Sequence, residues 1–260
     1  MNYKLSFSTA SLFPRYSLDA LRMIQDSGFL YAELMPQCYE EIKTSFARVI
    51  LDEIKIKIAS VHFPLVLFSI FYNPYPGAIK ESRKLVDNIT EMAEMLDSEI
   101  IVIHPPRLDN ETVRKLFHDA IIDNIRYLCE ISQKHGVKIA LENMPNGGRT
   151  LEELQNIIKE IDHENIFPML DTTEAMESDQ NPINMLKRMN LIHIHISDYD
   201  TGKKHLMPGE GKIDWSEFFN ILRKKQFAGF ITVEPSYKYL IENPVEKMVK
   251  VRVFLEKLLR

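Results

Sequence analysis

The sequence predicts an α/β fold, a single (β/α)8 barrel with a metal site at the C-terminal face of its strands. Short apolar or β-branched runs alternate with longer helical patterns along the 260 residues. Successive predicted strands begin about 32 residues apart on average, which fits a βα unit of roughly 30 residues or more. No Pro- or Ser-rich linker divides the chain, so we expect residues 1–260 to form one domain.

The expected strands are short and largely apolar. Strands of a parallel sheet are covered on both faces, so they read as near-continuous apolar runs such as Ile100-Ile101-Val102-Ile103. The eight predicted strands start at Leu5, Tyr31, Ile58, Ile100, Lys138, Phe167, Ile192 and Gly229.

Helical patterns fill most of the gaps between these strands. Ser17 and Asp214 are expected N-caps, Thr150 and Glu153 form a capping box, and Gly28 ends the first helix. The expected helices span residues 17–27, 78–96, 112–135, 151–161, 215–225 and 244–258.

A doubly wound sheet is the alternative fold. The segment after the first strand reads Ser8-Thr9-Ala10-Ser11. It lacks the glycines that let a backbone cradle phosphates, so the nucleotide-binding classes lose most of their support.

Composition excludes several classes of protein. The chain is 45% hydrophobic and 27% charged, which is typical of a globular protein, and its net charge of -5 argues against a broadly basic nucleic-acid coat. Cys38 and Cys129 are far apart, which predicts a reducing compartment. We find no secretory signal and no apolar run that could span a bilayer, so we expect a cytoplasmic protein without a membrane partner. A homo-oligomer remains open.

Six successive strands carry a metal-capable side chain at or near their C-terminal end. These ends form one face of a barrel, where barrels place their chemistry, so the six side chains should converge. Histidine and carboxylate are preferred ligands of divalent transition metals. A single acid at a strand end is more often a helix cap or a solvated residue, so the shared position is what predicts a site. The six residues are His62, His104, Glu142, Asp171, His195 and Glu234.

His193 and His195 must be distinguished, because they lie two residues apart and both point into the barrel. His195 is nearer the C-terminal rim, and we expect it to be the ligand. His193 would lie one layer deeper, as a core histidine or as a residue that orients a ligand.

These strand ends resemble the xylose isomerase-like TIM-barrel superfamily, which includes sugar phosphate isomerases and epimerases and endonuclease IV. The resemblance implies a divalent metal (Mn, Mg, Co or Zn) held by Glu142, Asp171, His195 and Glu234. It also implies that Glu142 and Glu234 move a proton next to the carbonyl of a small sugar or sugar phosphate. The matching segments are Val61-His62-Phe63-Pro64, Ile103-His104-Pro105, Leu141-Glu142-Asn143, Leu170-Asp171-Thr172, His195-Ile196-Ser197-Asp198, His205, residues 208–215 and Thr232-Val233-Glu234.

Endonuclease IV suggests the alternative function, a phosphodiesterase acting on abasic DNA, in which nucleic acid would be the partner. Its trinuclear zinc site implies that His62, His104 and His205 join the ligands. Two positions depart from that pattern: Glu174 stands where the family often has His, and Lys203 stands where the endonuclease has Asp. Glu174 could still bind a metal or substrate, but Lys203 cannot bind a metal in place of Asp, so we expect one or two ions rather than three. A barrel that only binds a metabolite is disfavoured by the intact glutamates.

Further candidates each have two interpretations. Arg107 and Lys203 either meet an anionic substrate group or are solvated loop charges, and Asn143 either contacts a sugar hydroxyl or caps a turn. Glu33 either binds substrate or forms an internal ion pair. The aromatic loop 63–77 forms either a lid over the site or an oligomer interface.

Overall fold

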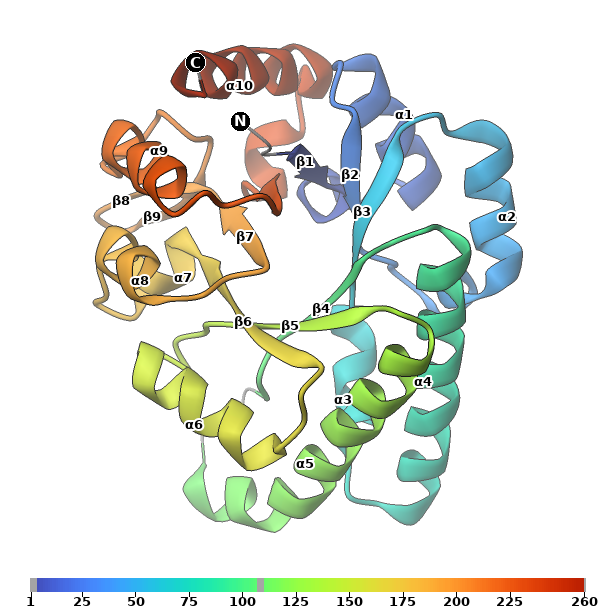
Figure 1. Ribbon diagram of the computed structural model, residues 1–260. Helices are drawn as coiled ribbons and strands as arrows, with labels where there is room; N and C mark the ends of the chain where they lie inside the picture. Colours follow the sequence, from blue (N-terminus) through green and yellow to red (C-terminus); the bar gives the residue numbers. More distant parts are fainter. Residues whose placement is uncertain (1–3, 107–109, 260) are drawn as a thin grey trace.

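The barrel is closed, as the sequence predicts. A computed structural model describes residues 4–106 and 110–259. Eight parallel strands follow one another around the barrel in the order β1-β10-β7-β6-β5-β4-β3-β2, and helices surround them (Figure 1). Each predicted strand start lies within one residue of the observed one. The barrel strands are β1 Lys4–Ser8, β2 Tyr31–Leu34, β3 Lys57–His62, β4 Ile100–Ile103, β5 Lys138–Glu142, β6 Ile166–Asp171, β7 His193–Ile196 and β10 Phe230–Val233.

The outer helices match the predicted ones closely. Thr150 Oγ1 accepts a hydrogen bond from the Glu153 amide at 3.1 Å, which confirms the N-cap hydrogen bond of the predicted capping box. The Ser17 cap is wrong: the helix begins at Ser17 itself, and the Ser17 hydroxyl donates to Glu41 Oε2 at 2.7 Å instead. These helices are α1 Ser17–Asp26, α4 Pro76–Met95, α5 Glu111–Lys134, α6 Leu151–Ile161, α9 Trp215–Lys224 and α10 Pro244–Leu258.

Other helical segments were not predicted. Helix α2 lacks a side-chain N-cap and a glycine stop, so the sequence carries few boundary signals for it. The remaining segments are too short to show a helical period. The additional helices are α2 Thr44–Glu53, α3 Phe68–Phe71, α7 Thr172–Glu177 and α8 Pro182–Arg188, with 3-10 turns η1 Thr9–Leu12, η2 Tyr39–Ile42, η3 Leu65–Leu67 and η4 Tyr237–Leu240.

Strand alternation divides the barrel interior into an apolar and a polar layer. An apolar cluster that includes Val102, Ala140 and Met169 fills the interior toward the strand N-termini. Side chains two residues apart on a strand share a face, so His104 and Glu142 point the same way as Val102 and Ala140. The interior therefore changes from hydrophobic to ionisable toward the C-terminal mouth. A larger hydrophobic core lies between the outer faces of the strands and the helices.

The segment after β7 contains the antiparallel hairpin β8 Asp198–Asp200 and β9 Lys203–Leu206. The buried Asp198 carboxylate organises this segment. It accepts hydrogen bonds from the amides of Gly209 at 2.9 Å and Ile213 at 3.1 Å, and from Trp215 Nε1 at 2.8 Å. A Cβ atom at Gly211 would collide with this carboxylate, so the close approach requires glycine.

The aromatic loop after β3 packs mostly inward. Phe71 and Tyr72 are buried in the core, whereas Tyr75 is exposed. The Phe68 ring stacks on His104, with ring centroids 5.6 Å apart. Phe68 therefore links this loop to the C-terminal mouth of the barrel.

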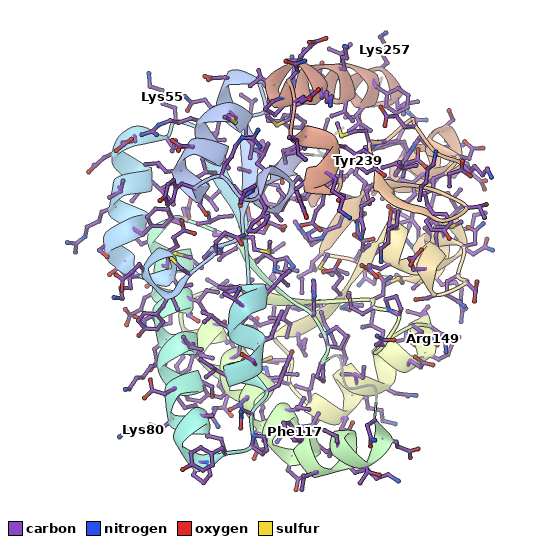
Figure 2. All side chains as sticks on the ribbon, turned by 180° about the vertical axis from the view of Figure 1, so that it is seen from behind. Lys55, Lys80, Phe117, Arg149, Tyr239 and Lys257 are labelled. Atoms are coloured by element: carbon purple, nitrogen blue, oxygen red, sulfur yellow. The ribbon has the colours of Figure 1, made fainter. Side chains whose placement is uncertain are left out.

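Charged side chains cover the outside of the helices. Figure 2 shows the labelled Lys55, Lys80 and Lys257 at the periphery of the molecule. Within residues 4–106 and 110–259, we find no helix with the length and hydrophobicity that a membrane span requires.

Candidate metal centre

Four of the predicted ligands meet at the C-terminal mouth of the barrel. Glu142 and Asp171 are the last residues of β5 and β6, His195 lies in β7, and Glu234 directly follows β10. The strands β5, β6, β7 and β10 are consecutive around the barrel. One potential ligand atom of each residue lies within 4.8 Å of the corresponding atoms of the other three. The order of the strands thus brings together residues that are far apart in sequence.

The atoms that face this centre are suited to a cation. Within the described residues, Asp171 Oδ2, Glu142 Oε2 and His195 Nδ1 are buried and make no hydrogen bond, although Glu142 Oε2 lies 2.9 Å from His104 Nε2. His195 Nδ1 nevertheless lies 2.9 Å from Glu234 Oε2 and 3.4 Å from Glu142 Oε1. Buried polar atoms without partners are costly unless a proton or a metal ion compensates them. One imidazole nitrogen and three carboxylates form a donor set that fits a divalent transition metal or Mg²⁺.

Neighbouring residues fix the orientation of the carboxylates. Asp171 Oδ1 accepts from the Glu174 amide at 2.7 Å and caps α7, which leaves Oδ2 directed elsewhere. Asn143 is fully buried, donates to the Asp171 carbonyl at 3.2 Å and accepts from the Asp171 amide at 2.7 Å. The structure therefore directs Asn143 to the Asp171 backbone and not to the pocket. Ser8 Oγ donates to Glu234 Oε1 at 3.0 Å.

The electrostatics of the centre depend on burial and on the histidines. Burial alone would raise the pKa of Glu142, but His104 and His195 hold this pKa well below its usual range. Burial raises the pKa of Asp171 to about 8, and the nearby Glu142 and Glu174 carboxylates add to the increase. Burial opposes a charge on His195, yet the surrounding carboxylates raise the pKa of His195 well above its usual value. The centre therefore favours a positive charge at His195 Nδ1.

A second group of potential ligands adjoins the first and shares Glu142 with it. His62, His104 and Glu142 also have potential ligand atoms within 4.8 Å of one another. His104 Nε2 lies 2.9 Å from Glu142 Oε2 and 3.1 Å from His62 Nε2. His62 Nδ1 lies 2.8 Å from the Phe63 carbonyl oxygen, to which it can donate its proton. In that tautomer His62 Nε2 is left as an acceptor that faces His104.

The remaining predicted residues are more scattered. His205 Nε2 lies 3.3 Å from Glu174 Oε1, and both side chains line a pocket at the C-terminal mouth of the barrel. Lys203 is exposed on β9 and is absent from the described lining of that pocket. Arg107 lies outside the described residues.

A cavity of about 440 Å³ opens above the ligand groups. The predicted residues that line it are His62, His104, Glu142, Glu174, His205 and Glu234. Leu65 and Val66 also line it, and they belong to the loop 63–77 that was expected as a lid or an interface. Sequence reasoning missed the remaining walls, which come from the segments after β1, β2 and β10 and whose signal was their position just beyond a strand end. These walls include Ala10, Phe13, Met35, Gln37, Pro235, Ser236 and Tyr237.

Residues 21–258 match the family described as xylose isomerase-like TIM barrel. The chain belongs to this family. The fold and the resemblance expected from the strand-end motifs are thereby confirmed.

This xylose isomerase-like barrel covers different shares of the length of three curated relatives. An uncharacterized protein of Methanocaldococcus jannaschii is 32% identical over 190 residues, which is 65% of this chain and 64% of that protein. The inosose dehydratase of Clostridium beijerinckii is 26% identical over 157 residues, 52% and 53% of the two chains. The barrel thus spans about half to two thirds of the length of these two relatives. The inosose isomerase of Halalkalibacterium halodurans is 24% identical over 268 residues, 95% and 94% of the two chains.

Solved structures share the fold along nearly the whole barrel. A D-tagatose 3-epimerase-like protein superimposes with a TM-score of 0.81 at 23% identity, covering 98% of this chain and 97% of that one. The IOLI protein, solved with a bound zinc atom, gives a TM-score of 0.76 at 19% identity, with 98% of each chain covered. At these identities the likeness shows the fold alone.

Proposed function

We propose that this xylose isomerase-like barrel is a divalent-metal-dependent isomerase or epimerase of a small sugar, sugar phosphate or related keto-polyol. The observation that carries the proposal is the convergence of Glu142, Asp171, His195 and Glu234 within 4.8 Å of one another at a cavity of about 440 Å³. Similarity to a protein named inosose isomerase and to a D-tagatose 3-epimerase-like protein supports this proposal. Among these substrates a neutral sugar is favoured, because the pocket carboxylates repel a phosphate dianion.

The four residues would hold the ion, and the two glutamates would also move the proton. A bound divalent cation polarises the substrate carbonyl and stabilises the charge that develops on its oxygen. Burial opposes ionisation of Glu142 and Glu234, yet His195 and, for Glu142, also His104 lower the pKa of each glutamate. Both glutamates are therefore carboxylates at neutral pH, able to accept a proton from the carbon next to the carbonyl. One glutamate would remove the proton, and the other would return one to the opposite face of the same carbon in an epimerisation or to the former carbonyl carbon in an isomerisation.

Hydrogen exchange tests this function. Full-length protein with Mn²⁺ or Co²⁺ is incubated with a panel of ketoses in D₂O, and deuterium at the carbon next to the carbonyl is followed by NMR. We expect exchange with at least one ketose, and a loss of about 100-fold or more in Glu142→Gln and Glu234→Gln. Glu40→Gln is the matched control, because Glu40 is exposed and pairs with Lys43 at 2.6 Å. Absence of exchange across the panel would contradict the proposal.

The second candidate is the endonuclease-like phosphodiesterase. It is favoured by one observation, the group His62, His104 and Glu142 beside the first ligand group. The net charge of -5 and the exposed position of Lys203 weigh against it. Incubation with an abasic DNA duplex at several salt concentrations tests it, since phosphate contacts make DNA binding salt-sensitive. This second function would be favoured if wild type nicks the duplex, His104→Gln does not, and no ketose exchanges hydrogen.

A further inference from the structure

We propose that Glu33 is a positioning residue that makes His195 a metal ligand through its Nδ1 atom. The proposal rests on the metal centre proposed above. Glu33 lies in β2, three strands away from β7 around the barrel. It is fully buried and belongs to the polar layer just inside the mouth.

A single oxygen of Glu33 receives three donors. Glu33 Oε2 lies 3.0 Å from Nε2 of His195 and 3.0 Å from Nε2 of His193. Ser60 Oγ donates to the same oxygen at 2.7 Å. All four side chains are fully buried. The carboxylate thus holds both histidines of β7 from across the barrel interior.

A β-bulge on β3 places Ser60 against Glu33. Ala32 pairs with Ile58, but Glu33 pairs with Ser60, so the register passes over Ala59. An extra residue on one strand re-aims the neighbouring side chains. Among the barrel pairings of the described strands, this is the one irregular register. The bulge brings the Ser60 hydroxyl opposite Glu33.

This contact determines which nitrogen of His195 can bind a metal. A neutral imidazole has one N–H donor and one acceptor nitrogen. With Nε2–H donated to Glu33, Nδ1 carries the lone pair and points between Glu142 Oε1 and Glu234 Oε2. A carboxylate on the distal nitrogen also fixes the ring and makes the imidazole a stronger ligand.

Glu33, His193 and His195 form another group whose atoms could hold an ion. There Glu33 Oε2 is already satisfied by hydrogen bonds, but Glu33 Oε1 and His193 Nδ1 make none within the described chain, and neither do His195 Nδ1 and Asp171 Oδ2 at the mouth. The mouth offers four potential ligands, three of them carboxylates, whereas the deeper group offers three, so we place the ion at the mouth, with Glu33 behind His195.

A role in stability alone does not explain Glu33. The Glu33 carboxyl is fully buried, and its Oε2 accepts hydrogen bonds from two imidazoles and one hydroxyl. Replacing buried ionic groups by packed hydrophobic residues is often neutral or stabilising. A buried carboxylate at this position is thus costly for the fold, and its contact with His195 gives it a use.

Cobalt binding tests the proposal. Metal-free full-length wild type, Glu33→Gln, Ser60→Ala and His193→Gln are titrated with Co²⁺, and the visible absorption spectrum gives both affinity and ligand geometry. We expect Glu33→Gln to weaken Co²⁺ binding about 10–100-fold and to change the spectrum. Ser60→Ala, which removes another donor to the same oxygen, should stay within about threefold of wild type, because it leaves His195 and Glu33 in contact.

The outcomes distinguish a failure of the metal centre from a failure of the positioning role of Glu33. Wild type that binds no Co²⁺ overturns the metal centre itself. Glu33→Gln with wild-type affinity and spectrum overturns only the positioning role, as does an equal loss in Ser60→Ala. A loss in His193→Gln as large as in Glu33→Gln places the ion at the deeper group and also overturns it. If Glu33→Gln does not fold, long-range ¹H–¹⁵N spectra of the Zn²⁺-loaded wild type decide. A proton on His195 Nε2 supports the proposal, and a proton on Nδ1 contradicts it.

Discussion

His195 Nδ1 lies 2.9 Å from Glu234 Oε2, in an orientation outside hydrogen-bond geometry. The contact follows from strand register. His195 pairs with Thr232 on the neighbouring strand, and Glu234 follows two residues later on the same face. A nitrogen and a carboxylate oxygen held this close in a buried site require a positive charge, either a proton or a metal ion.

Metal binding should stabilise the protein. An ion present at about 100 times its Kd adds about 2.7 kcal/mol to the free energy of unfolding. Asp171→Asn should lose most of this gain, because one carboxylate leaves the ligand group while the N-cap of α7 is kept. Urea unfolding with EDTA and with Mn²⁺ measures both values. Asp123→Asn, at an exposed position of α5, is the control. An equal Mn²⁺ gain in wild type and Asp171→Asn would contradict the assignment.

The affinity for metal should depend on pH through Asp171. Burial raises the pKa of Asp171 to about 8, so the metal-free protein carries a proton there at neutral pH. Metal binding must displace this proton and also the proton that the raised pKa of His195 keeps on its Nδ1, so the affinity should rise by at least about tenfold per pH unit up to about pH 8. Co²⁺ titrations between about pH 6 and about pH 9 measure this slope. A constant Kd below pH 8 would show that no proton is displaced.

Asp198 should be essential for the segment after β7. Asp198→Ala leaves the Gly209 and Ile213 amides and Trp215 Nε1 without their acceptor. We expect a loss of about 3 kcal/mol or more in the free energy of unfolding, since each unsatisfied buried donor costs about 1–3 kcal/mol. Asp200→Ala removes only a surface ion pair with Lys212 and should cost less than about 1 kcal/mol. Equal unfolding curves for the two variants would argue against this role.

The two cysteines should differ in reactivity. Cys38 is exposed, whereas Cys129 is buried and burial raises the pKa of its thiol to about 12. At pH 8 only about one Cys129 in 10⁴ is then a thiolate, and the reactive fraction grows as the pH rises toward that pKa. A thiol reagent such as DTNB should modify about one thiol per native chain at pH 8 and about two after denaturation. Two fast-reacting thiols in the native protein would be inconsistent with the buried position of Cys129.

The sequence predicted the barrel well, because strand period and strand ends are local signals. Val102 and His104, or Ala140 and Glu142, lie two residues apart, so one inward residue implies the next. Alternation cannot separate His193 from His195; nearness to the C-terminal rim selected His195, and the structure brings His195 to the other three residues. That these residues bind a metal stays a prediction.

Other features depend on relationships that no local pattern carries. The bulge on β3 brings Ser60 opposite Glu33 and results from the pairing of two strands, and the contact of Glu33 with His195 crosses the barrel interior. Asn143 was considered for a sugar contact, but its partner is the backbone of Asp171, 28 residues later in the chain. The β8–β9 hairpin depends on the Asp198 carboxylate, whose partners extend to Trp215.

Elemental analysis shows whether the residues at the barrel mouth bind a metal. Glu142 belongs to both ligand groups at the mouth, so Glu142→Gln should disturb every ion held there. Full-length wild type and Glu142→Gln are dialysed against Mn²⁺ or Zn²⁺, then against metal-free buffer, and analysed for elements. We predict about one to two divalent ions per wild-type chain and less than about one tenth of that in Glu142→Gln. Wild type without a bound ion, or equal contents in both proteins, would contradict the account.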